Sequence, residues 1–76
     1  MPKVLFFGEL RDIVNCTEWQ CEGAENTAQL LDMMELKWPG LQGKTFSIAV
    51  NRKIYKETVN LNEGDEVALL PPFSGG

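Results

Sequence analysis

Residues 61–76 read LNEGDEVALLPPFSGG, and this segment decides the fold because it joins a turn, a strand and a strand terminator. Gly64 supplies the positive φ that the turn needs, and residues 66–70, EVALL, have the content of a strand. Pro71 and Pro72 lack the backbone N–H that a β-ladder uses, so the strand ends before them. We therefore predict a folded domain over residues 1–70 and an extended tail over residues 71–76.

Four further strands are expected upstream of this segment. Residues 3–7, 17–22, 46–51 and 53–55 are rich in β-branched and aromatic side chains. The first two strands are close enough in sequence to suggest a hairpin, and residues 8–14 between them are expected to form a turn or a single helical turn. In residues 46–51, the side chains of Phe46, Ile48 and Val50 alternate and therefore share one face.

One helix is expected over residues 26–38, NTAQLLDMMELKW. Its apolar stripe at helical spacing consists of Leu30, Leu31, Met34 and Trp38. Asn26 or Thr27 can cap its start, with Gln29 placed as in a capping box, and the following Pro-Gly pair ends it. The resulting order β-β-α-β-β-β predicts an α+β fold with a sheet of about five strands and one main helix on one face.

The first and last strands are apolar on both faces. Val4 and Phe6 point one way and Leu5 and Phe7 the other, and residues 67–70 repeat this arrangement. A single helix covers only one of these faces, so the other is expected to meet a partner or to be covered by a loop. Strand parity alone leaves open which set faces outward.

The tail suits delivery of its end into another protein. Pro71 and Pro72 favour a stiff, extended path, and a diglycine passes through a channel too narrow for other residues. The α-carboxylate of Gly76 is ionised at pH 7 because its pKa is about 3.3–3.7, and it becomes a reactive acyl group once adenylated. The alternative is an ordinary frayed terminus.

Composition excludes several classes of function. The chain has 7 basic and 11 acidic residues, a net charge of −4 and no histidine, so we expect basic protein surfaces as partners, no nucleic-acid or membrane binding, and no metal site. Cys16 and Cys21 are five residues apart and are expected to be free thiols. Without a signal peptide or an apolar run of about 20 residues, a cytoplasmic location is expected.

The chain resembles the MoaD family, the small subunits of molybdopterin synthase, which are ubiquitin-like β-grasp sulfur carriers related to ThiS. The resemblance lies in KVLFFGELRDI (residues 3–13), VN (residues 50–51) and the closing LNEGDEVALLPPFSGG. It implies that an activating enzyme resembling MoeB uses ATP to adenylate Gly76, and that sulfur transfer then gives a thiocarboxylate. The carrier would dock on a large subunit resembling MoaE, in a heterotetramer, and convert cyclic pyranopterin monophosphate into molybdopterin.

The resemblance also implies which residues act. The tail Pro71, Pro72, Phe73, Ser74 and Gly75 would insert into the partner, and Phe7, Arg11, Ile54 and Leu70 would form the partner interface. The catalytic bases would belong to the partners, and no cofactor would be bound by this chain. Phe73 stands where the family usually has a smaller aliphatic residue.

Three alternatives remain open at this point. The first is a ThiS-like carrier for thiamine or another thiolated product. The second is a ubiquitin-like modifier joined to target lysines through Gly76, and the third is a pure binding module. Conjugates of higher mass would indicate the modifier, and reconstitution with another synthase would indicate the other carrier.

Overall fold

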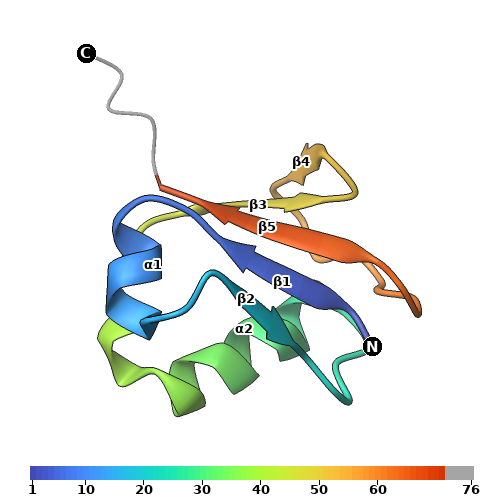
Figure 1. Cartoon of the computed structure of the whole chain (residues 1–76). Coiled ribbons are helices and arrows are strands. Elements are labelled where there is room, and N and C mark those ends of the chain that lie inside the picture. The colour runs from blue at the N-terminus through green and yellow to red at the C-terminus, as the bar shows by residue number, and fades with distance from the viewer. Residues whose placement is uncertain (72–76) are drawn as a thin grey trace.

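A computed structural model describes residues 1–71 of the chain and places five strands in one sheet, with the main helix across one face (Figure 1). The strands are β1 (Lys3–Phe6), β2 (Glu18–Gln20), β3 (Ser47–Val50), β4 (Lys53–Tyr55) and β5 (Glu66–Leu70). The helices are α1 (Glu9–Val14), α2 (Thr27–Lys37) and the 3-10 turn η1 (Pro39–Leu41). The predicted α+β fold, with five strands and one main helix, is confirmed.

The strand order is β2-β1-β5-β3-β4, so the last strand lies at the centre of the sheet. β1 and β5 run parallel, with Lys3 opposite Glu66 and Phe6 opposite Leu69, and the other three pairs are antiparallel. The sheet is therefore mixed. The parallel pair places β1, near the N-terminus, beside β5, the last strand of the chain.

The core lies between α2 and the face of the sheet that carries Val4, Phe6, Val67 and Leu69, which are all at most 2% exposed. From the helix, Leu30 and Met34 are fully buried, whereas the other two members of the predicted stripe, Leu31 and Trp38, are half-buried. The Trp38 ring makes edge-to-face contacts with Phe6 and with Trp19 of β2. The helix thus buries one narrow stripe and closes the end of the core with an aromatic cluster.

The start of α2 is capped by Asn26, whose side-chain oxygen accepts a hydrogen bond of 2.8 Å from the Gln29 backbone N–H. The Gln29 side chain accepts in turn from the backbone N–H of Glu25, one residue before the position that a capping box uses. The Gln29 N–H, which the helix itself leaves unpaired, and the N–H of the preceding Glu25 are therefore both satisfied. The predicted cap is confirmed, with Asn26 in that role.

Replacing Asn26 with alanine should lower the free energy of unfolding by about 1 kcal/mol, because the first turn of α2 loses its acceptor. Urea unfolding at pH 7 measures this difference. The matched control, Asn26→Asp, keeps a side-chain oxygen and should unfold near the wild-type urea concentration. An alanine variant as stable as the wild type would contradict the capping role.

The connection between β1 and β2 differs from the hairpin predicted. The two strands are antiparallel neighbours, but α1 lies between them, with Leu10 and Val14 buried against the core. The sequence reading of a turn or one helical turn was too short. The four-residue spacing of Leu10 and Val14 is the signal for a helix. The segment is too short for this single spacing to distinguish a helix from a turn.

β3 begins at Ser47, so Phe46 precedes the strand instead of opening it. Ile48 lies opposite Leu69, and Val50 lies opposite Val67, so both share the core-facing side of the sheet, as predicted. β3 and β4 are joined by Asn51 and Arg52, which have φ values of 50° and 73°. Two consecutive positive φ angles match a type I′ turn, which suits the right-handed twist of a hairpin.

The side chain of Asp65 connects this turn to the start of β5. Its carboxylate accepts hydrogen bonds from the backbone N–H of Asn62 (2.7 Å) and from the side-chain amide of Asn51 (3.0 Å). These two bonds, the backbone one foremost, hold the pKa of Asp65 below its ordinary value of 3.8. The ionised form therefore stabilises the folded state.

The contribution of Asp65 to stability should depend on pH. Because folding lowers its pKa, the contribution is complete above pH 3.8 and disappears as the pH falls through the lower, folded value. Asp65→Ala should lower the free energy of unfolding by on the order of 1 kcal/mol at pH 7. Denaturant melts from pH 7 to pH 2 should show the two proteins converging at the acid end. A difference in the free energy of unfolding that stays constant over this pH range would show that the charge of Asp65 does not affect stability.

Both cysteines are free thiols, as predicted. Cys21 is fully buried, and this burial raises its pKa, whereas Cys16 is half-buried. Among the helices of residues 1–71, none has both the length and the apolar character needed to cross a membrane.

Candidate functional site

The face of the sheet opposite α2 carries an apolar surface. In one row across the sheet, Ile54 lies opposite Ala49, Ala49 opposite Ala68, and Ala68 opposite Leu5. Phe7 directly follows β1, and Leu70 is the last residue of β5. Each lies two residues after a member of this row, so the alternation of side chains brings both to the same face. We call this surface the outer apolar patch; it consists of Leu5, Phe7, Ala49, Ile54, Ala68 and Leu70, of which Ala49 is buried at its floor.

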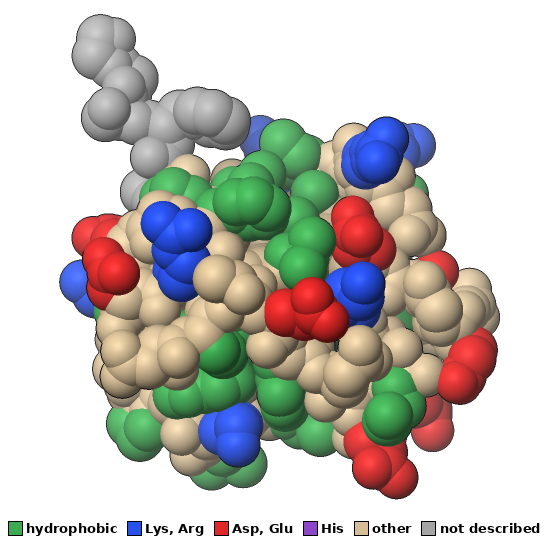
Figure 2. Space-filling model, viewed as in Figure 1, with side chains coloured by type: hydrophobic (Ala, Val, Ile, Leu, Met, Phe, Trp, Pro, Cys, Tyr) green, Lys and Arg blue, Asp and Glu red, His purple; other side chains and the backbone are tan. Residues whose placement is uncertain are grey.

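The exposure of these side chains answers the question that strand parity left open. Phe7 is 43% exposed and Ile54 is 50% exposed, which are high values for large apolar side chains. Figure 2 shows hydrophobic side chains gathered in the upper middle of this view, with charged side chains around them. The structure thus brings three of the residues predicted for a partner interface, Phe7, Ile54 and Leu70, onto one surface.

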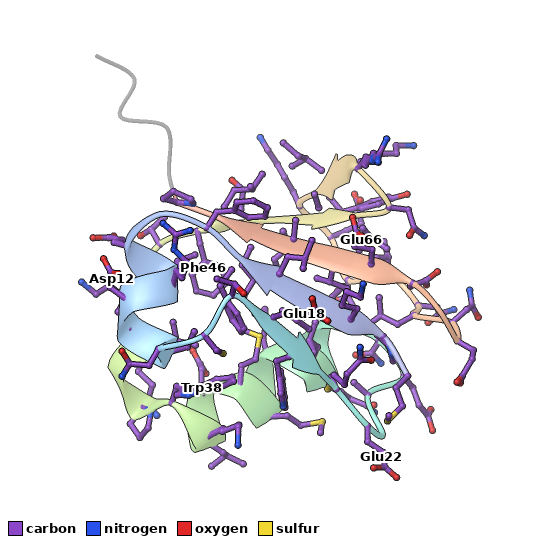
Figure 3. The ribbon with its side chains drawn as sticks, in the orientation of Figure 1. Asp12, Glu18, Glu22, Trp38, Phe46 and Glu66 are labelled. Carbon is purple, nitrogen blue, oxygen red and sulfur yellow. The ribbon has the colours of Figure 1, made fainter. Side chains whose placement is uncertain are left out.

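Charged residues border the patch. On the outer face, Glu18 of β2 lies opposite Leu5, and Glu66 of β5 lies opposite Lys3 (Figure 3). Arg11, the fourth residue predicted for the interface, is exposed on α1, and its backbone N–H donates to the carbonyl of Gly8. The patch therefore has an apolar centre and a polar border, the usual anatomy of a protein–protein interface.

The tail leaves from the end of β5, beside this patch. β5 ends at Leu70, as the proline pair predicted, and that end lies between β1 and β3. The Phe7 backbone N–H donates to the carbonyl of Leu69 at 3.2 Å, and Leu70 lies opposite Ser47. Both neighbouring strands therefore hold the end of β5, from which Pro71 continues the chain.

Gly8 is a residue at this point that sequence reasoning missed. Its φ is +60°, and a Cβ at this position would lie 2.8 Å from Cγ of Pro71. A side chain at residue 8 would therefore strain the backbone and press on the first residue of the tail. The only signal for this contact was a glycine directly after a strand, and that pattern by itself indicates a turn.

Of the tail residues predicted to act, only Pro71 lies within the described part of the chain, where it is half-buried. Pro72, Phe73, Ser74, Gly75 and Gly76 lie outside the described residues. Their roles, including that of the Gly76 carboxylate, remain predictions. The interface roles of the patch residues are likewise predictions about residues whose positions are now known.

Comparison with known proteins identifies the family of this chain and its relatives. Residues 4–76 match the ThiS family. The chain is 32% identical to the molybdopterin synthase sulfur carrier subunit of Mycobacterium tuberculosis, over 96% of this chain and 94% of that protein.

Two solved structures share the fold. The small archaeal modifier protein 1 of Methanosarcina acetivorans superposes with a TM-score of 0.84 at 25% identity, over 99% of this chain and 95% of that one. A complex of subunits 1 and 2 of the molybdopterin-converting factor from Helicobacter pylori contains a chain that superposes with a TM-score of 0.71 at 24% identity, over 99% and 97%. The chain therefore belongs to the ThiS family, with a ubiquitin-like β-grasp fold and whole-length similarity to molybdopterin synthase sulfur carrier subunits.

Proposed function

We propose that this chain is the sulfur carrier and small subunit of a molybdopterin synthase, with Gly76 as the residue that carries the sulfur. The observation that carries the proposal is similarity to a sulfur carrier subunit along the whole chain. The match to the ThiS family includes both the central strand β5 and the diglycine that follows it. A carrier needs such a segment leading from a rigid body to its reactive end.

The chemistry at Gly76 proceeds in two steps. An activating enzyme resembling MoeB lets the carboxylate attack the α-phosphorus of ATP, so that pyrophosphate leaves and an acyl adenylate forms. Hydrosulfide supplied by the sulfur source then attacks the acyl carbon, AMP leaves with the bonding electrons of the acyl–phosphate bond, and the thiocarboxylate remains after loss of one proton. The activation is needed because an ionised carboxylate is a poor acyl donor at pH 7.

In the second half of the cycle, the charged carrier docks on a large subunit resembling MoaE, within a heterotetramer, and donates its sulfur to cyclic pyranopterin monophosphate. The outer apolar patch is the surface best suited to this docking, since it lies beside the exit of the tail. The large subunit supplies the catalytic bases, and ATP is bound by the activating enzyme. This chain supplies the sulfur, the tail and the docking surface.

Tandem mass spectrometry of the C-terminal peptide tests the proposal. The full chain is incubated with ATP, a sulfur source and the activating enzyme of the same organism. Fragment ions should place one sulfur, in exchange for one oxygen, on Gly76. Fragmentation is required because this exchange has the same nominal mass change as addition of one oxygen to a methionine or cysteine. An unmodified Gly76, with an activating enzyme that charges a known carrier, would overturn the proposal.

A second candidate function is protein modification, which the structural similarity to a small archaeal modifier protein favours. In that case the adenylated Gly76 would be joined to lysine side chains of target proteins. Cell extracts would then contain species of higher mass that carry this chain and resist thiol reagents. Their absence, together with sulfur on Gly76, would leave the carrier function alone.

A further inference from the structure

β4 is an edge strand whose outer side is unpaired. It pairs only with β3, through the opposed pairs Ile48–Tyr55, Ala49–Ile54 and Val50–Lys53. Within residues 1–71, the backbone of Lys53, Ile54 and Tyr55 makes no hydrogen bond outside this ladder. An unpaired edge of this kind is a template on which another extended chain can add.

The charge around β4 is opposite to that of the rest of the molecule. Residues 51–58 carry three cations, Arg52, Lys53 and Lys56, and one carboxylate, Glu57, for a local charge of +2. The rest of the chain carries four cations and ten carboxylates, for a charge of −6. All three cations are exposed. The edge strand is thus a basic strip on an acidic protein.

Two hollows flank β4. One, of about 300 Å³, is lined by Phe46, Ser47, Ile48, Ile54, Tyr55 and Lys56. The other, of about 120 Å³, lies between the β3–β4 hairpin and α2 and is lined by Thr27, Ala28, Leu31, Ile48, Tyr55, Lys56, Glu57 and Thr58. Ile48, Tyr55 and Lys56 line both hollows, and Glu57 lines only the smaller one. Each hollow can receive one apolar side chain of a segment that runs along the edge.

We propose that β4 binds an extended acidic segment of a partner protein, which adds to the sheet as a sixth strand. Its carboxylates meet Arg52, Lys53 and Lys56, and an apolar side chain fills the hollow of about 300 Å³. A second copy of this chain does not fit, because pairing β4 with itself opposes like charges. The site lies at the β4 edge of the sheet, and the proposed binding uses none of the tail residues 71–76.

The β4 site adjoins the outer apolar patch, but binding at β4 does not require a partner on the patch. Ile54 lies in the patch and also lines the larger hollow. At the far end of that hollow, Ser47 is opposite Leu70, the last residue of β5, and Phe46 lies toward the end of the sheet from which the tail departs (Figure 3). A partner bound through both surfaces would be held at the edge and at the root of the tail together.

A model peptide tests the proposal on the intact chain. The probe is the acetylated, amidated heptapeptide Glu-Val-Glu-Val-Glu-Val-Glu, titrated into the ¹⁵N-labelled protein at low salt. The largest shift changes should fall on the amides of residues 46–48 and 53–57, and exchange of the β4 amides with solvent should slow. Affinity should weaken by at least about tenfold between 20 mM and 500 mM NaCl, because screening removes the charge attraction.

Three matched comparisons separate this site from general attraction. Lys53→Glu should weaken binding by at least about tenfold. Lys37→Glu is its control, because each lysine stacks over a neighbouring aromatic ring at nearly the same distance, 5.4 Å for Tyr55 and 5.3 Å for Trp38. The Lys37→Glu variant should bind the acidic peptide with an affinity within twofold of that of the wild type. A peptide with lysine in place of each glutamate, and one with proline in place of the central valine, should both fail to bind.

Several results would overturn the proposal. These are no binding of the acidic peptide at millimolar concentration, shift changes centred on the outer face away from β4, and equal loss of affinity in Lys53→Glu and Lys37→Glu. Binding of the proline peptide as tightly as the original would exclude strand addition. None of these results bears on sulfur transfer by Gly76, which is measured separately.

Discussion

Adding a single alanine after Gly76 should abolish sulfur transfer and leave the fold unchanged. The reacting carboxylate would then belong to a residue with a side chain, displaced by about 3.5 Å along the chain. Both changes act at the reacting atoms, where misplacement by about 1 Å can cost a hundredfold in rate. We expect no thiocarboxylate and no molybdopterin above background. Deletion of Gly76 should have the same effect.

The measurement combines mass spectrometry of the C-terminal peptide with molybdopterin formation in the reconstituted synthase. Thermal unfolding should give the same midpoint for both variants and the wild type, because the added or deleted residue follows the last strand. Leu36→Ser, a change at an 82% exposed side chain of α2, serves as a control that alters composition away from the tail. An extended chain that still supplies sulfur would refute the assignment of the chemistry to Gly76.

Replacing Phe7 with glutamate should weaken binding to the large subunit of the synthase by about a hundredfold. An aromatic side chain at the centre of an interface commonly contributes 2–4 kcal/mol, and about 3 kcal/mol corresponds to a factor near one hundred. Phe7 is 43% exposed in the free chain, so the substitution leaves the core intact and buries a charge only in the complex. Ile54→Glu should act in the same way.

Leu36→Glu is the matched control for this prediction. It introduces the same charge at an exposed apolar side chain, but on α2, which covers the opposite face of the sheet. Its affinity for the large subunit, measured by calorimetry, should equal that of the wild type. Equal affinities for Phe7→Glu and Leu36→Glu would show that the outer apolar patch is not the docking surface.

The main helix and most of the strands could be predicted from the sequence because their patterns are long and bounded. Asn26 before α2 and the proline pair after β5 mark ends that depend only on local backbone chemistry. α1 was underestimated because six residues carry too little periodicity to distinguish a helix from a turn. A hydrophobic pattern identifies a helix only when it extends over several helical turns.

The site was harder to predict, for reasons of three-dimensional packing. Leu5 and Phe7 are as apolar as Val4 and Phe6, so composition cannot decide which pair faces solvent, and the position of α2 decides it. The contact between Gly8 and Pro71 joins residues far apart in the sequence, and no local pattern reports it. The smaller hollow beside β4 likewise exists only once α2 and the β3–β4 hairpin are assembled, and the larger one only once the hairpin has formed.

The parallel pairing of β1 with β5 has a consequence for biosynthesis. Lys3 is made early and Glu66 late, yet they are opposite each other in the finished sheet. Since β5 is the central strand, the β1–β2 pair and the β3–β4 pair cannot join into one sheet before β5 has been synthesised. A nascent or truncated chain that stops before residue 66 exposes its apolar strands and becomes a substrate for chaperones and proteases. A copy that has folded has therefore been translated at least through β5, the strand that directly precedes the tail of residues 71–76.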